Sequence, residues 1–426
     1  MMRRTLEPME ALCESDADIY DRLSRKHSFY TDKPCSNSPR ADAEAPMKTR
    51  RPISINNSLS HGICNCNCTL CGVNKPGYKG PKEFQPKAVT EALIRRIRES
   101  ARRGLYVRYV GNAGDGEPTL HPEFGERMDM FGAMIREWDV PEAPAPEVSV
   151  VTNGVRLMRP GVLDAFTRNP LTLIVSFPTP DPESYGMLMS GDPRKGPTLL
   201  KHVVPGIRQA LRLHAQGRIQ RVQFHISPPD RDVVRRDFNR TVHFLTSLAR
   251  DAGVEGIDMV LFPATSNRSG LIRNTTKGLD TYKDFFQVYR RWNHLNGVRV
   301  SLKLSYQRFF PRKSEFIDLL RAYDFPCTWN SQLFVTAAGD STCCNDQAVR
   351  NPMGNLLTAS LPELMANKER HRPGRVCGGC DQRPDRLAGS WLFTLFGRLA
   401  MLKLRRAEAR TARTAPSLPV LETDGM

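Results

Sequence analysis

The sequence predicts an α/β fold, an open or partial (β/α) barrel, because short apolar segments alternate in strict order with longer helical segments. Such alternation is typical of a parallel sheet, whose strands are joined through helices. There are about six such units, too few for the eight of a closed barrel. A cysteine-rich loop directly follows the first apolar segment, where the strand ends of such folds gather their chemistry.

The expected elements follow from runs of apolar residues and from helical periodicity. We predict strands at residues 53–59, 105–110, 148–152, 171–177, 220–226 and 256–262. Helices are expected between and after them, at residues 88–103, 123–138, 161–168, 199–214, 233–251 and 279–291. A last strand at 298–304 and a helix at 313–323 precede a hairpin closed by Ala-Ala-Gly-Asp and a helix at 360–368.

Composition indicates a soluble globular protein, with 40% hydrophobic and 25% charged residues. No segment reaches the roughly 20 apolar residues of a membrane span, and the first residues lack the apolar core of a secretion signal. We therefore expect a cytoplasmic protein. The net charge of +17 suggests an anionic partner, such as a nucleotide, RNA or a membrane surface, or only a basic solvated surface.

The 11 cysteines are an odd number in a chain much longer than small disulfide-rich domains. Cys13 and Cys35 stand alone in a polar leader, residues 1–50, that we expect to be disordered. The other cysteines form two groups, at residues 64–71 and 327–380. This clustering favours metal ligation over disulfides.

The first group, Cys-Asn-Cys-Asn-Cys-Thr-Leu-Cys, has Cys64, Cys68 and Cys71 at the spacing C-x3-C-x2-C. Three thiolates so close in sequence can bind one 4Fe-4S cube and leave its fourth iron open. Cys66 is an additional thiol between them. The alternative is a zinc site in which Cys66 completes a tetrahedral set.

Further motifs stand at the ends of the next predicted strands. Asp115-Gly116-Glu117-Pro118 follows the second, Thr152-Asn153-Gly154 ends the third, and Ser176 ends the fourth. With the cysteine loop, this ordered set resembles the radical S-adenosylmethionine (SAM) superfamily over residues 51–305. The resemblance implies a partial (β/α)6 barrel of TIM type, with SAM bound by Gly116, Glu117, Pro118, Thr152, Asn153 and Ser176.

Each of these residues also has a simpler interpretation. Glu117 could cap the following helix, and Asn153 and Ser176 could make ordinary turn hydrogen bonds. Gln223 and His225, on the fifth strand, could line the pocket, although His225 is as well explained as a core histidine.

The second cysteine group resembles the SPASM or twitch extension of radical SAM enzymes, which we place at residues 306–385. The resemblance implies an auxiliary 4Fe-4S cluster held by Cys327, Cys344 (or Cys343), Cys377 and Cys380. A structural zinc ribbon with the same thiolates is the alternative. Residues 386–426 contain a basic amphipathic helix, which docks on the protein or lies on anionic membrane, and a disordered tail.

The resemblance implies an enzyme that reductively cleaves SAM to a 5'-deoxyadenosyl radical and abstracts a hydrogen atom from its substrate. We expect it to oxidise or rearrange a small sugar-like or phosphorylated molecule, with an electron from flavodoxin or ferredoxin. Modification of a peptide or of RNA is the alternative. A zinc-bearing nucleic-acid-binding protein is more remote, since it does not account for the motifs at successive strand ends.

Overall fold

The computed structural model describes residues 53–69, 71–76, 78, 80–141, 143–226, 231–261, 294–304, 332–342 and 352–370. Within these residues one sheet of 11 strands runs in the order β13-β12-β11-β1-β4-β5-β6-β7-β8-β10-β9. Every pairing from β11 to β10 is parallel. The expected α/β fold with a parallel, open sheet is therefore confirmed.

The parallel strands coincide closely with the predicted apolar segments. They are β1 (Ile53–Asn57), β4 (Val107–Asn112), β5 (Glu147–Thr152), β6 (Thr172–Ser176), β7 (Arg221–Ile226), β8 (Gly256–Leu261) and β10 (Val298–Leu304). Helices α2 (Lys87–Arg102), α3 (Phe124–Arg136), α4 (Val162–Arg168), α6 (Gly196–Ala215) and α7 (Arg231–Asp251) connect them as expected. The helix predicted at 279–291 and the one at 313–323 lie outside the described residues.

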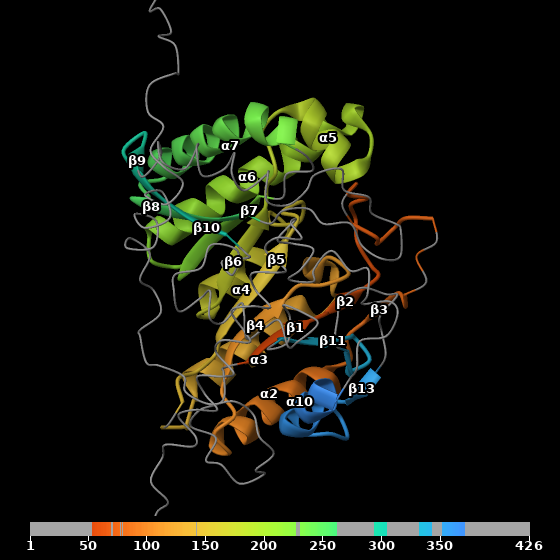
Figure 1. The fold of residues 1–426 in the computed structure, drawn as a ribbon. Helices are drawn as coiled ribbons and strands as arrows, with labels where there is room; N and C mark the ends of the chain where they lie inside the picture. The colour runs from red at the N-terminus through yellow and green to blue at the C-terminus, as the bar shows by residue number, and fades with distance from the viewer. Residues whose placement is uncertain are drawn as a thin grey trace, which may run out of the picture.

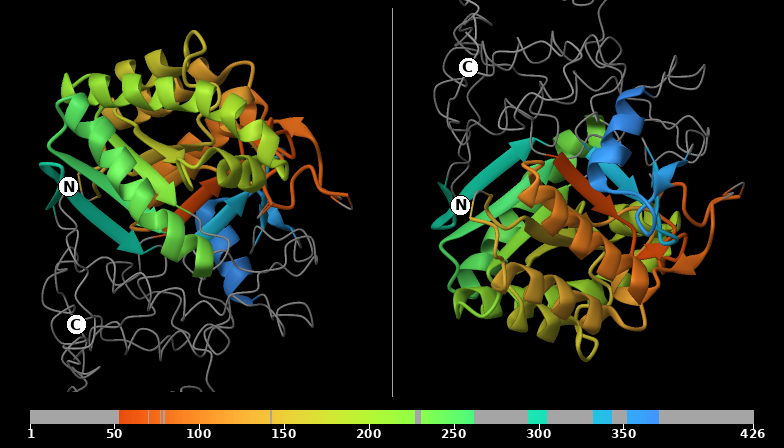
Figure 2. Two further views of the ribbon diagram at one scale, coloured as in Figure 1. Left: turned by 90° about the horizontal axis from the view of Figure 1, so that it is seen from above. Right: turned by 90° about the horizontal axis from the view of Figure 1, so that it is seen from below.

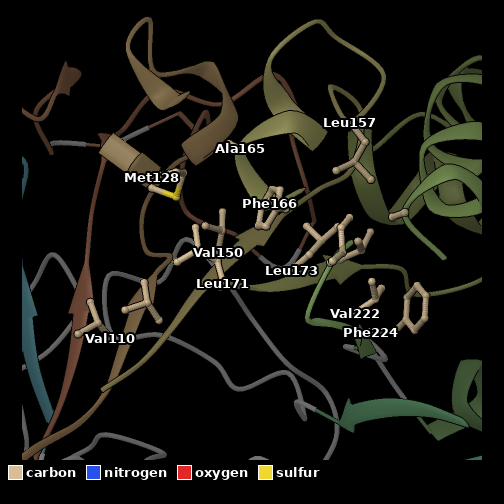
Figure 3. Packing of buried hydrophobic residues seen from close by; sticks show 14 of the residues in the cluster. Val110, Met128, Val150, Leu157, Ala165, Phe166, Leu171, Leu173, Val222 and Phe224 are labelled. Carbon is tan, nitrogen blue, oxygen red and sulfur yellow. The ribbon is translucent and has the colours of Figure 1, made fainter. Parts of the chain in front are cut away.

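The helices cover one face of the curved sheet, as Figure 2 shows in two views. Strand residues alternate between the two faces, so every second residue meets the helices. Val150 and Leu173, for example, are buried in one core with Phe166 of α4 and Met128 of α3. Figure 3 shows these apolar side chains packed between strands and helices. The core therefore lies between the sheet and its outer helix layer.

The opposite face of the sheet carries polar as well as apolar side chains. Arg221 of β7 donates from Nε to Asp258 Oδ2 (2.8 Å) and from one terminal nitrogen to Glu147 Oε1 (3.2 Å). Thr172 donates to the same Glu147 oxygen at 3.2 Å, and the Tyr109 hydroxyl is hydrogen-bonded to Ser149. The concave face therefore carries a polar network around Glu147 near the amino ends of β5, β6 and β7, and a separate Tyr109–Ser149 pair.

The chain returns to the sheet after residue 331. The predicted hairpin forms from β11 (Gln332–Val335) and β12 (Asp340–Thr342), and β13 (Pro352–Asn355) pairs with β12. β11 lies parallel to β1, so this segment extends the sheet of residues 53–304. Helix α10 (Leu361–Arg370) follows and lies beside α2 (Figure 1). The domain boundary expected at residues 305/306 stays a prediction.

Several predicted features lie outside the described residues: the polar leader, the cysteines at 327, 343, 344, 377 and 380, and the helix within 386–426.

The smaller pair of strands, β2 (Ser60–His61) and β3 (Glu83–Phe84), flanks the cysteine loop on both sides in the sequence. Of the helices that the structure describes, none combines the length and the apolar character that crossing a bilayer requires.

Candidate active site

The cysteine loop emerges from β2, beyond the carboxyl end of β1. Asn74 sits in the left-handed region (φ 64°) and donates from Nδ2 to the carbonyl oxygens of Cys64 (3.0 Å) and Cys66 (2.8 Å). The Cys71 amide donates to the Cys68 carbonyl at 3.1 Å. These internal bonds give the loop a compact turn, because a side chain from its far end closes it.

The four thiols of the loop differ in exposure. Cys66 is buried, with 5% of its surface exposed, and belongs to the hydrophobic core. Cys64, Cys68 and Cys71 are partly exposed, and no disulfide joins any of the four. The structure therefore separates Cys66 from the three cysteines of the C-x3-C-x2-C spacing.

The pKa values of Cys64 and Cys66 differ in the same way as their exposure. The thiol of Cys66 donates a hydrogen bond toward Cys64, which raises the pKa of Cys66 and lowers the pKa of Cys64. Burial raises the pKa of Cys71 to about 12. A metal ion would deprotonate such a thiol outright, since thiolate is the ligand form.

The chemistry of this donor set fits an iron-sulfur cube, whose three protein-bound irons take one thiolate each. Across the described residues, no three Cys, His, Asp or Glu side chains converge as they would around a single ion. Partly exposed Cys64, Cys68 and Cys71 on one compact loop leave a side open to a cluster and its ligand.

Helix α5 (Pro182–Ser190) contacts the loop from outside, and it is not among the helices predicted from the sequence. The amides of Asn67 and Thr69 donate to the carbonyls of Met189 (3.1 Å) and Leu188 (2.9 Å). The sulfur atoms of Cys68 and Met189 are 3.9 Å apart. A cavity of about 320 Å³ lies between loop and helix, lined by Cys64, Asn65, Cys66, Asn67, Asn74, Met189, Ser190, Lys195 and Leu199.

Capping residues could have revealed this helix. Asp181 accepts from the Ser184 amide at 2.9 Å, Pro182 follows it, and Gly191 ends the helix at φ 72°. Asp-Pro before a helix and Gly after it are standard start and stop signals. The apolar periodicity of α5 is weak because both the loop and α6 cover it, so its sequence pattern does not predict a helix.

The segment Asp115-Gly116-Glu117-Pro118 packs directly against the cysteine loop. The Glu117 amide donates to the Ile63 carbonyl at 2.9 Å, and Pro118, which is buried, begins the short helix η2 (Pro118–Leu120). A Cβ atom on Gly116 would overlap the carbonyl oxygen of Ser60. Gly116 is thus required for contact between two protein segments, and its expected contact with SAM stays a prediction.

The Glu117 carboxylate joins two of the motifs, and only 2% of the residue is exposed. Its Oε1 accepts from the Thr119 amide (3.1 Å), the Thr119 hydroxyl (2.6 Å) and the Thr152 hydroxyl (2.7 Å), while Oε2 accepts from the Asn153 amide (2.8 Å). Burial raises the pKa of Glu117. The capping role considered above is therefore present, and Oε2 retains capacity for a further donor.

Thr152 and Asn153 complete the connection at the end of β5. The Asn153 side chain donates from Nδ2 to Asn65 Oδ1 at 2.7 Å and lies 3.8 Å from the Cys64 sulfur. Hydrogen bonds thus run from Glu117 through Asn153 to the cysteine loop. The three motif segments, which follow β1, β4 and β5, form one connected site at the carboxyl ends of these strands.

Ser176 lies one strand further along, at the end of β6, and is partly buried. It pairs in register with His225 of β7, so both residues lie on the same face of the sheet. Burial lowers the pKa of His225 to about 3, which keeps its imidazole neutral at physiological pH. The bonds that join the other motifs do not include Ser176, and its expected contact with SAM stays a prediction.

Comparison with known proteins places this site in a family context. Residues 59–213, which contain the loop and the following motifs, match the model of the Radical SAM superfamily. No curated protein matched the chain.

Solved structures of related fold include two of Streptococcus suis SuiB. SuiB bound to S-adenosylmethionine has 12% sequence identity and a TM-score of 0.52, covering 78% of this chain and 71% of SuiB. SuiB bound to the precursor peptide SuiA has 12% identity and a TM-score of 0.53, covering 84% and 76%. anSMEcpe with bound AdoMet and Cp18Cys peptide has 17% identity and a TM-score of 0.51, covering 79% and 88%. At these identities the likeness concerns the fold.

Proposed function

We propose that this chain, an enzyme with a radical SAM domain at residues 59–213, binds a 4Fe-4S cluster through Cys64, Cys68 and Cys71. In this proposal the site binds SAM beside the cluster. The radical that forms when SAM is cleaved removes a hydrogen atom from a substrate over the concave face of the sheet.

One observation carries the proposal: Glu117 and Asn153 connect the cysteine loop to the ends of β4 and β5 by direct hydrogen bonds. A site of this kind holds its parts in fixed relative positions, which one-electron chemistry at a bound cofactor requires. The partial exposure of three thiols and the burial of Cys66 support the choice of ligands.

When bound, the cluster and SAM would supply a one-electron cleavage that yields the 5'-deoxyadenosyl radical. The chain's own residues bind and orient the cluster and SAM. Glu117 would accept a hydrogen bond from the ammonium of SAM at Oε2, and a cation there would stabilise a carboxylate whose burial raises its pKa. Gly116, Pro118 and Thr152 would hold Glu117 in place, and Ser176 would reach the ligand from β6.

We further propose an auxiliary cluster held by Cys327, Cys344 (or Cys343), Cys377 and Cys380. Support comes from the position of β12, which ends at Thr342, immediately before two of these cysteines, in the hairpin that pairs with β1. Such a cluster could accept an electron from the substrate radical, which makes oxidation the first reaction type to test.

The substrate we propose is polar and small, sugar-like or phosphorylated, because the chain's net charge of +17 suits an anionic ligand. A peptide is the second candidate, and it is favoured by two proteins of similar fold that hold peptides, SuiB with SuiA and anSMEcpe with Cp18Cys peptide. An RNA substrate is the alternative that suits the basic charge of the chain. A flavodoxin or ferredoxin would supply the electron for SAM cleavage in a cytoplasmic setting.

Anaerobic reconstitution followed by iron, sulfide and zinc analysis tests the proposal. We expect a brown protein that converts SAM to 5'-deoxyadenosine under dithionite. Cys68→Ala should abolish this cleavage, whereas Cys66→Ala, the matched change at the buried thiol, should retain most of it. Stoichiometric zinc in a colourless protein, or equal loss of cleavage in both variants, would contradict the ligand assignment. Deuterated candidate substrates, with label sought in 5'-deoxyadenosine, would then identify the substrate class.

A further inference from the structure

The side chain of Asn153 is oriented so that its NH₂ group faces the Cys64 sulfur. Its Oδ1 accepts a hydrogen bond from the Val155 amide at 3.0 Å, and a backbone amide can only donate. The opposite end of the side-chain amide must therefore be the NH₂ group. One of its hydrogens is directed to Asn65 Oδ1 at 2.7 Å, and Nδ2 lies 3.8 Å from Cys64 Sγ.

The backbone of Asn153 is held as firmly as its side chain. Its amide donates to Glu117 Oε2 at 2.8 Å, and only 7% of the residue is exposed. The next residue, Gly154, has φ 80°, which lets the chain turn away immediately after β5. Asn153 is therefore fixed on three sides, and its NH₂ group is directed at the sulfur with no further loss of side-chain entropy when a cluster binds.

Cys64 also accepts a hydrogen bond from the Cys66 amide, with 3.4 Å between nitrogen and sulfur. Two N–H groups thus face one sulfur atom, one from the loop itself and one from Asn153, which directly follows β5. Hydrogen bonds to a cysteine sulfur stabilise negative charge on it, and they are a recognised means of changing the potential of an iron-sulfur cluster.

We infer that Asn153 is a positioning residue that raises the reduction potential of a cluster bound through Cys64, by donating an N–H···S hydrogen bond to that cysteine. The inference rests on the proposed function. Its physical basis is that the reduced cluster carries one more negative charge than the oxidised cluster, so a donor at the sulfur stabilises the reduced form more. A low-potential electron carrier would then reduce the cluster more completely.

The test is the midpoint potential of the reconstituted full-length protein, measured by redox titration with EPR detection of the reduced cluster. Asn153→Asp is nearly isosteric and keeps the acceptor for Val155, but it replaces the donor by a negatively charged oxygen. Asn153→Ala removes the donor without adding charge. Asn65→Ala is the matched control, because it removes the other partner of the same NH₂ group and leaves the sulfur contact in place.

We expect Asn153→Ala to lower the ratio of reduced to oxidised cluster about tenfold at a given solution potential, which is about 59 mV for one electron. Asn153→Asp should lower it further, and Asn65→Ala should change it less than twofold. Equal potentials in wild type and both Asn153 variants would overturn the inference. So would loss of iron from both variants, because Asn153 would then serve cluster assembly. A wild-type protein that binds no cluster would instead refute the proposed function itself, and the inference with it.

Discussion

The carboxylate of Glu117 is the most connected polar group of the site, and its removal gives a sharp test of the structure. Glu117→Ala leaves the amides of Thr119 and Asn153 without their acceptor in a buried place. Each buried donor without a partner costs about 1–3 kcal/mol. The hydroxyls of Thr119 and Thr152 can rotate, so they add less.

Part of this loss is offset because the variant no longer buries a carboxylate. Burial raises the pKa of Glu117, which shows that the charged form is disfavoured in the folded chain. The two amide donors together would cost about 2–6 kcal/mol. Because of the offset, we expect Glu117→Ala to lower the free energy of unfolding by roughly 2–4 kcal/mol, the lower part of this range. Glu117→Gln keeps an acceptor for the threonines but directs an NH₂ group at the Asn153 amide, and it should cost about 1–3 kcal/mol.

Urea denaturation of the full chain under anaerobic conditions, followed by circular dichroism, measures these differences. The matched control is Glu126→Gln, the same chemical change at a pair whose side chains are 44% and 54% exposed, with 2.6 Å from Lys87 Nζ to Glu126 Oε1. A surface pair of this kind contributes less than about 1 kcal/mol. If Glu117→Gln destabilises the protein no more than Glu126→Gln does, the Glu117 carboxylate does not hold the site together.

Two further predictions concern backbone packing and pH. Gly116→Ala should destabilise the protein by about 2 kcal/mol or more, because its Cβ would overlap the Ser60 carbonyl. The control Gly125→Ala in α3, where the nearest atom is 3.7 Å from the new Cβ, should be neutral or stabilising. Equal denaturation midpoints for these two variants would contradict the prediction. His225 has a lowered pKa, about 3, so its contribution to stability is complete above the unfolded value near 6.5 and is lost as the pH falls toward 3. Unfolding free energy should fall by up to about 1.4 kcal/mol per pH unit in that interval; His225→Gln should reduce this slope, and an unchanged slope would show that His225 does not titrate as inferred.

The alternation of strands and helices could be predicted because it depends on neighbours in sequence. Apolar side chains that meet one helix layer recur with the period of a strand or a helix, and this pattern is visible in residues 53–261. The order of the motifs was predictable for the same reason, since each directly follows a strand and parallel strands end at one edge of the sheet.

The contacts between distant segments could not be predicted in this way. The position of β11 beside β1, the packing of α5 on the cysteine loop and the burial of Cys66 all depend on residues more than 100 positions apart. Local periodicity carries no information on such pairings, because they form only when separate elements pack together.

By itself the sequence determined the α/β class, the thiol spacing at Cys64, Cys68 and Cys71, and the succession of motifs at strand ends. Only the tertiary structure decided what Glu117, Gly116 and Asn153 contact. The reason is physical: a carboxylate, a glycine or an amide has the same local preferences in many turns, and its partners are chosen by the segments that folding places around it.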